Sequence, residues 1–150
     1  MSKIELENLQ KEIIVKRKTW GNELVQVDFK DLTGHDKTQD QTFLKNYFHS
    51  LNLDDFNAQL YSVDTHSGLE QLIGLLYKDV LHHHPAMPLR WAAELAAKFV
   101  APFDDSKTRC YSNHVSLNLI DGHRAILYKS VIFIDDKLVG LVFVGEEVVD

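Results

Sequence analysis

Apolar residues recur three and four positions apart through much of the first two-thirds of the chain, which is the spacing of one helix face. This spacing predicts four helices, over residues 3–17, 43–51, 67–84 and 88–100. Ser2 and Glu5 mark the start of the first helix as a capping box, and Ser67 and Glu70 mark the start of the third. Pro85 should end the third helix, because the residue before a proline avoids helical dihedral angles.

In the last third of the chain, residues 111–120 alternate apolar and polar side chains, which is the period of a β-strand. Strands are predicted over residues 111–120, 124–134 and 138–144, after a strand at 25–29 and a short one within 57–63. Asp121-Gly122 is a hairpin signal, so the last three strands should form an antiparallel meander. We therefore expect an α+β fold, with about four helices packed on one face of a mainly antiparallel sheet that ends in a C-terminal three-stranded meander. Residues 1–150 are expected to form a single α+β domain.

The strand at 138–144 is apolar on both faces. An exposed apolar strand of this kind invites aggregation, because its backbone can pair with other chains. The strand should therefore be central in the sheet and covered on both sides, or buried in the interface of a homodimer.

Composition and charge narrow the class of protein. Apolar residues make up 45% of the chain and charged residues 25%, as in ordinary soluble globular proteins. The net charge of −6 disfavours a nucleic-acid partner, because phosphate binding usually needs a basic surplus. No apolar run approaches the roughly 20 residues of a membrane-spanning helix, and the first residues lack the apolar core of a signal peptide. With Cys110 as the single cysteine, these features predict a cytoplasmic protein with no membrane partner.

A polar stripe on the strand at 111–120 is one candidate ligand site. Strand periodicity places Ser112, His114, Ser116 and Asn118 on one face, opposite Val115, Leu117 and Leu119. The next strand carries Arg124 and Tyr128. On a concave sheet these side chains would line a pocket, with His114 as general base or ligand contact. On a convex sheet the stripe is the solvated face of an antiparallel strand, which is the commoner arrangement.

Three adjacent histidines, His82, His83 and His84, raise the question of a transition metal. Adjacent helical residues project about 100° apart, so one ion could not easily take all three. Asp79 and His83 are four positions apart and would give two ligands at most. Histidines also suit the last turn of a helix, near the negative end of its dipole. We therefore predict a solvated helix end, with no metal and no cofactor.

Acidic pairs fall at predicted turns or ends of elements. The members that could contact a partner are Asp54, Asp55, Asp104, Asp105, Asp135 and Asp136. Carboxylates at such positions usually serve turn chemistry and solubility. If several gathered on one surface, that surface would attract a basic protein and speed their encounter.

These features favour a binding protein over an enzyme. The first hypothesis is a small, acidic, non-enzymatic cytosolic protein that binds a protein partner, for example a toxin-neutralising immunity protein or an adaptor. The alternative is a small-molecule-binding domain or simple enzyme with a pocket between the meander and the helices. That layout is compatible with NTF2-like and PAS-like folds by analogy of architecture alone.

Overall fold

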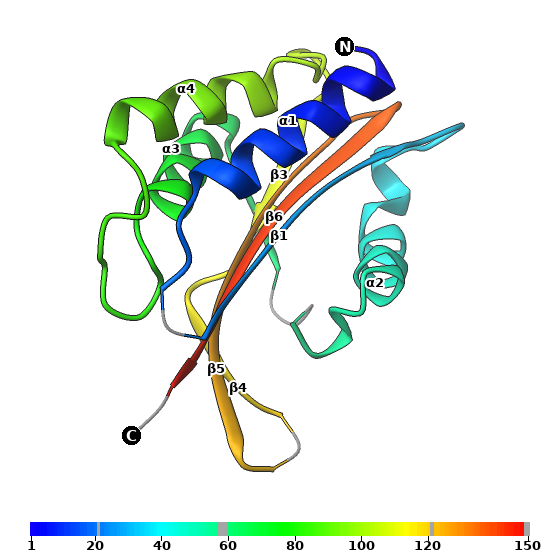
Figure 1. Cartoon of the computed structure of the whole chain (residues 1–150). Helices are drawn as coiled ribbons and strands as arrows, with labels where there is room; N and C mark the ends of the chain where they lie inside the picture. Colours follow the sequence, from blue (N-terminus) through cyan, green and yellow to red (C-terminus); the bar gives the residue numbers. More distant parts are fainter. Residues whose placement is uncertain (21, 57–59, 121, 149–150) are drawn as a thin grey trace.

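The computed structural model describes residues 1–20, 22–56, 60–120 and 122–148. A six-stranded antiparallel sheet lies between two helical layers (Figure 1). One face is covered by α1 (Lys3–Lys16), α3 (Thr65–Tyr77) and α4 (Leu89–Val100), and the other by α2 (Asp40–Ser50). The predicted α+β class is confirmed, but the expectation that all helices share one face is wrong. Tyr47 and Phe48 bury α2 against the opposite face, in a second apolar cluster.

The order of strands in the sheet is β1 (Glu23–Asp31), β6 (Leu138–Val148), β5 (Arg124–Ile134), β3 (Arg109–Ser112) and β2 (Tyr61–Val63). A further strand, β4 (Ser116–Ile120), also pairs with β5. The antiparallel β4–β5–β6 meander is confirmed. Of its predicted hairpin residues, Asp121 lies outside the described residues, and Gly122 has the left-handed φ of 78° that glycine tolerates.

Strand β6 occupies the centre of the sheet. It pairs with β1 on one side and with β5 on the other, so both of its edges are used. Val142 and Val144 face the α1, α3 and α4 layer, whereas Val139 and Leu141 face α2. The central position predicted for the strand at 138–144 is therefore confirmed. A homodimer interface through this strand has no support, because one chain already buries both its faces and pairs both its edges.

The third helix begins and ends elsewhere than its sequence signals predict. Its N-cap is Asp64, whose carboxylate accepts a 2.8 Å hydrogen bond from the Ser67 backbone, so Ser67 is not the cap. The helix ends at Tyr77, well before Pro85. Lys78 and Pro85 form an isolated antiparallel bridge that closes residues 79–84 into a turn. The three histidines therefore lie in a turn and not on the end of a helix.

The strand predicted over residues 111–120 is interrupted by a β-bulge. Ser112 pairs with Val131, whereas Ser116 pairs with Tyr128, so three residues oppose two. The Asn113 side chain fixes this bulge, because its Oδ1 accepts from the Ser130 backbone at 2.7 Å and its Nδ2 donates to the His114 carbonyl at 2.7 Å. The extra residue reverses the side-chain alternation. Even-numbered side chains therefore face α3 in β3 but face α2 in β4.

Candidate functional site

The five residues predicted to share a ligand pocket do not converge. Ser112 is buried beneath α3, where its hydroxyl donates to the Gln71 side chain at 2.8 Å. Ser116 and Tyr128 face the other side of the sheet, toward α2. The bulge causes this separation, because it places Ser112 and Ser116 on opposite faces.

The histidine and the arginine of that predicted set lie at the surface. The exposed His114 ring packs against Tyr61 with 4.8 Å between ring centroids. Arg124 lies at the start of β5 and forms a 3.5 Å ion pair with Glu147. Neither side chain lies among the residues that line the cavity under α3.

A cavity does exist between α3 and the meander, where the ligand-binding alternative requires one. Its volume is about 270 Å³, and Gln71, Leu75, Val115 and Lys129 are among its lining residues. Lys129 donates to the Asn113 carbonyl at 2.7 Å, and partial burial lowers the pKa of its ammonium. Pockets for drug-sized ligands usually have volumes of about 300–1,000 Å³, so this cavity gives the alternative weak support.

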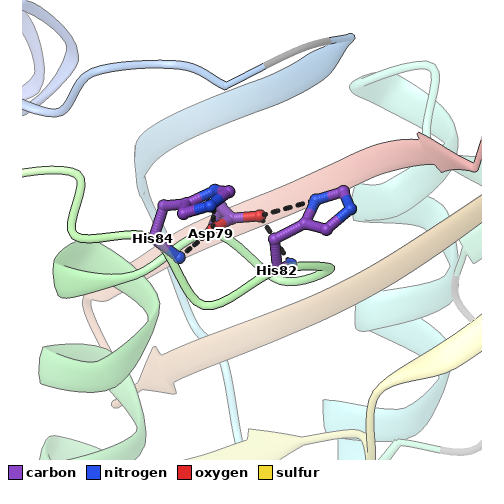
Figure 2. A group of neighbouring side chains, drawn as sticks. All are labelled: Asp79, His82 and His84. Atoms are coloured by element: carbon purple, nitrogen blue, oxygen red, sulfur yellow. Dashed lines mark hydrogen bonds and ion pairs between the residues drawn. The ribbon is translucent and has the colours of Figure 1, made fainter.

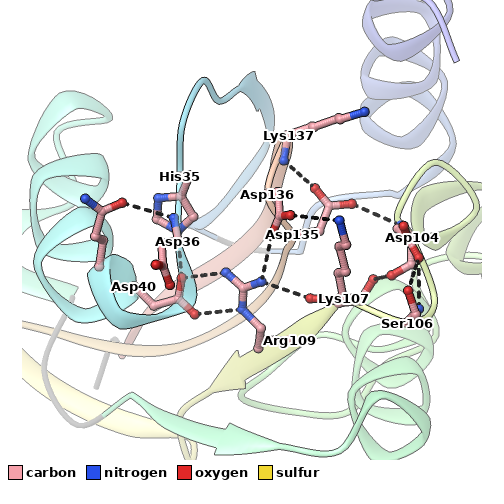
Figure 3. Close-up of polar contacts among 12 residues, drawn as sticks. His35, Asp36, Asp40, Asp104, Ser106, Lys107, Arg109, Asp135, Asp136 and Lys137 are labelled. Carbon is pink, nitrogen blue, oxygen red and sulfur yellow. Dashed lines mark hydrogen bonds and ion pairs between the residues drawn. The ribbon is translucent and has the colours of Figure 1, made fainter.

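Part of the predicted acidic surface gathers where the α4–β3 loop meets the β5–β6 turn (Figure 3). Asp135 accepts hydrogen bonds from the backbones of Lys137 and Leu138, both at 2.8 Å, and from that of Asp104 at 3.0 Å. Asp135 is itself only 5% exposed. It therefore stabilises the turn and offers no surface to a partner, contrary to the prediction.

Lysine and arginine side chains neutralise part of the other acidic groups at this corner of the molecule. Asp136 pairs with Lys107 at 3.1 Å and with Arg109 at 3.8 Å. Asp104 and Asp105 are exposed, but Asp104 uses its carboxylate on the backbone and hydroxyl of Ser106. This corner of the molecule is therefore mixed in charge and is a poor match for the predicted acidic surface.

Asp40 is the centre of a polar network that the sequence did not reveal. Its carboxylate accepts hydrogen bonds from Arg109 at 2.8 and 3.0 Å and from His35 at 2.7 Å (Figure 3). It also accepts one from the Tyr111 hydroxyl at 2.6 Å. Burial opposes ionisation of Asp40, but these donors outweigh it and lower the pKa of the carboxyl. The network ties the start of α2 to β3.

The turn after α3 brings a second set of titratable groups together. Asp79 is buried and accepts from the backbones of His82, at 2.8 Å, and of His84. The Nδ1 atoms of His82 and His84 lie 3.8 and 3.6 Å from its carboxylate oxygens, and Figure 2 shows both residues beside that carboxylate. His83 has a left-handed φ of 58° and lines the cavity under α3 instead. The sequence predicted His83 as the partner of Asp79, because residues four apart share one face of a helix. In this turn the partners are His82 and His84.

Glu146 approaches the same turn from the central strand. Its Oε1 accepts from the Leu81 backbone at 3.3 Å, and its Oε2 lies 3.5 Å from the Nδ1 of His82. Burial and a hydrogen bond with Asp79 raise the pKa of Glu146 to about 7. Two buried carboxyl groups and two imidazoles, contributed by a turn and a strand distant in sequence, thus lie at one place.

An apolar ridge is the remaining surface feature. Val115, Leu117 and Leu119, hereafter the β4 ridge, are 51%, 59% and 62% exposed. Leu117 and Leu119 lie in β4 on the α3 side of the sheet, and Val115 directly precedes the strand, at the pocket beside Gln71. The β4–β5 hairpin projects past the helical layers (Figure 1). The polar stripe was expected to form the solvated face, whereas in β4 the apolar side chains are the more exposed ones.

Comparisons of the chain with protein-family models, with curated proteins and with solved structures found no match. In the part of the chain that the structure describes, no helix combines the length and apolar character needed to cross a membrane. The features of the molecule that bear on function are the β4 ridge, the acidic groups and the turn after α3.

Proposed function

We propose that the chain is a non-enzymatic protein-binding module whose β4 ridge contacts a basic protein partner. The observation that carries this proposal is the exposure of three neighbouring apolar side chains, each more than half accessible, on one projecting hairpin. Single exposed apolar residues need no explanation, but a contiguous group of them favours an interaction surface.

The charge near the ridge supports a basic partner. Asp54 and Asp55 are exposed in the short helix η2 (Asp54–Phe56), which contacts β4. The Asn118 side chain of β4 donates to the Asp55 carbonyl at 2.5 Å, so these carboxylates lie near β4 but on its α2 face, opposite to the ridge. The chain as a whole has a net charge of −6. A basic partner that covers the ridge would be attracted by this net charge, and the field would speed its approach.

An immunity protein or an adaptor is a concrete form of such a module. A toxin that cleaves nucleic acid would present the basic surface this proposal requires. A cytoplasmic location is part of the proposal, and the lone, fully buried thiol of Cys110 supports it, since reducing compartments favour unpaired cysteines.

Native mass spectrometry of the protein purified from its own cells tests the proposal. We expect one basic protein at fixed stoichiometry, retained at low salt and released as the salt concentration rises. The double variant Leu117→Asp/Leu119→Asp should lose that partner. Val15→Asp is the matched control, because Val15 is 81% exposed on α1, and it should keep the partner.

Three outcomes would overturn the proposal. One is a double variant that binds the partner as the wild type does, and another is an equal loss of the partner in both variants. A homodimer that the double variant dissolves would instead assign the ridge to a second copy of this chain. Circular dichroism of each variant separates loss of binding from loss of folding.

A further inference from the structure

We propose that Asp79, His82 and His84, together with Glu146, bind one divalent transition-metal ion of the zinc class. One potential ligand atom from each of the first three residues lies within 4.8 Å of the other two. Their closest imidazole–carboxylate distances are 3.5, 3.6 and 3.8 Å, when Glu146 is included. Ligand atoms around a tetrahedral zinc lie about 3.4 Å apart, since each is about 2.1 Å from the ion. Binding would draw the ligand atoms of Asp79, His82 and His84 together from within 4.8 Å, and Glu146 would join them from beside His82.

The backbone of the turn holds these ligands before any ion arrives. The Lys78–Pro85 bridge closes the turn, and the Asp79 backbone donates to the His84 carbonyl at 3.0 Å. The Asp79 carboxylate also accepts from two backbone N–H groups of the turn, which fixes its orientation while leaving lone pairs for a metal. The left-handed residue His83 separates His82 from His84, whose rings stack with 5.5 Å between their centroids.

Charge at the site favours a cation. The side chains of Asp79 and Glu146 are 0% and 4% exposed, and among the described residues no lysine or arginine forms an ion pair with either. The neighbouring guanidinium of Arg17 is bound to Glu23. Carboxylates held inside a protein are normally paired or coordinate a metal. A dication would balance both, and two imidazole nitrogens with two carboxylate oxygens suit zinc.

The site is open on the side an ion would enter. The side chains of His82 and His84 are 59% and 51% exposed, above the two buried carboxylates. Trp20 stacks on the His84 ring with 4.7 Å between ring centroids, so its fluorescence should report ligation of that imidazole. An ion there would bridge the α3–α4 connection to Glu146 on the central strand β6.

Isothermal titration of metal-free protein with Zn²⁺ at pH 7.5 tests this assignment. We expect one equivalent to bind with a micromolar or tighter dissociation constant and to change the Trp20 fluorescence in a Trp91→Phe background. His82→Asn and His84→Asn should each weaken binding at least ten-fold, and Glu146→Gln at least five-fold. Co²⁺ should give the visible absorption of a tetrahedral complex.

His83→Asn is the matched control, because asparagine tolerates the left-handed conformation and His83 is not among the proposed ligands. It should bind Zn²⁺ within two-fold of the wild type. Binding weaker than about 100 µM in the wild type, or an equal loss in His83→Asn, would overturn the site and indicate adventitious binding by surface histidines. Unchanged affinity in Glu146→Gln would remove Glu146 from the ligand set.

Discussion

The guanidinium of Arg17 and the carboxylate of Glu23 form two hydrogen bonds, of 2.7 and 3.1 Å, with both side chains fully buried. Arg17 is the C-cap residue of α1, and it also donates to the carbonyls of Leu75 at 2.9 Å and Lys78 at 3.0 Å. One side chain therefore joins the end of α1, the start of β1 and the end of α3. The same contacts position the turn that carries Asp79.

Replacing Arg17 with methionine should lower the free energy of unfolding by about 3–5 kcal/mol, because it leaves the Glu23 carboxylate buried and unpaired. The double variant Arg17→Met/Glu23→Leu should recover only part of that loss, since an apolar pair needs no countercharge but still leaves the Leu75 and Lys78 carbonyls without the Arg17 donor. Urea unfolding followed by circular dichroism measures both. A double variant as unstable as Arg17→Met would contradict this account.

The Asp40 network predicts a pH-dependent contribution to stability. The folded-state pKa of Asp40 lies below its value of 3.8 in the unfolded chain, so the ionised carboxylate stabilises the fold above about pH 4. This contribution is lost as the pH falls through the lowered pKa. Asp40→Asn should therefore cost about 3 kcal/mol at pH 7, where it breaks the pair with Arg109, and progressively less below pH 4.

Unfolding in urea at several pH values between 7 and 2.5 measures that difference. Asp54→Asn is a suitable control, because Asp54 is exposed and its ion pair with His49 lies at the surface. It should change stability by less than about 1 kcal/mol at any pH. A cost for Asp40→Asn that stays constant down to pH 2.5 would rule out the linkage.

Two glycines of α3 should respond in opposite directions to the same substitution. A Cβ at Gly68 would collide with the Cys110 side chain and lie 3.2 Å from Phe133, so Gly68→Ala should destabilise the protein by about 1–3 kcal/mol. A Cβ at Gly74 would meet nothing within 4 Å, so Gly74→Ala should stabilise it by up to about 1 kcal/mol. Thermal unfolding of the two variants compares the effect of helix propensity with that of packing. If both substitutions destabilised the protein, α3 would have to pack differently.

Asn113 and His114 are neighbours with different predicted costs. Asn113 is fully buried and its side chain satisfies the backbone of the bulge, so Asn113→Ala should cost about 1–3 kcal/mol. His114 is exposed, and His114→Ala should change stability by less than about 0.5 kcal/mol. Chemical unfolding measures both. A large loss in His114→Ala would mean that its ring contact with Tyr61 is structurally important.

The sequence by itself determined most of the elements and the class of fold. Helical spacing from Leu6 to Ile13 predicted α1, and the range predicted at 124–134 coincides with β5. The strand at 138–144 is apolar on both faces, and this pattern predicted its central position, because an edge strand rarely buries both of its faces. These features are local, and one period of apolar residues is enough to read them.

Only the tertiary structure decided which side chains meet. The bulge at Asn113 depends on pairing with β5, and it separated Ser112 from Ser116, which sequence alternation had placed together. The end of α3 depends on the Lys78–Pro85 bridge and on the contacts of Arg17. Three adjacent histidines drew attention to the turn, but helical geometry predicted the wrong partner for Asp79. A one-residue shift in a strand, or the early end of a helix, changes the direction of every side chain that follows. Long-range contacts determine where such a shift or helix end occurs, and the local spacing of apolar residues does not encode those contacts.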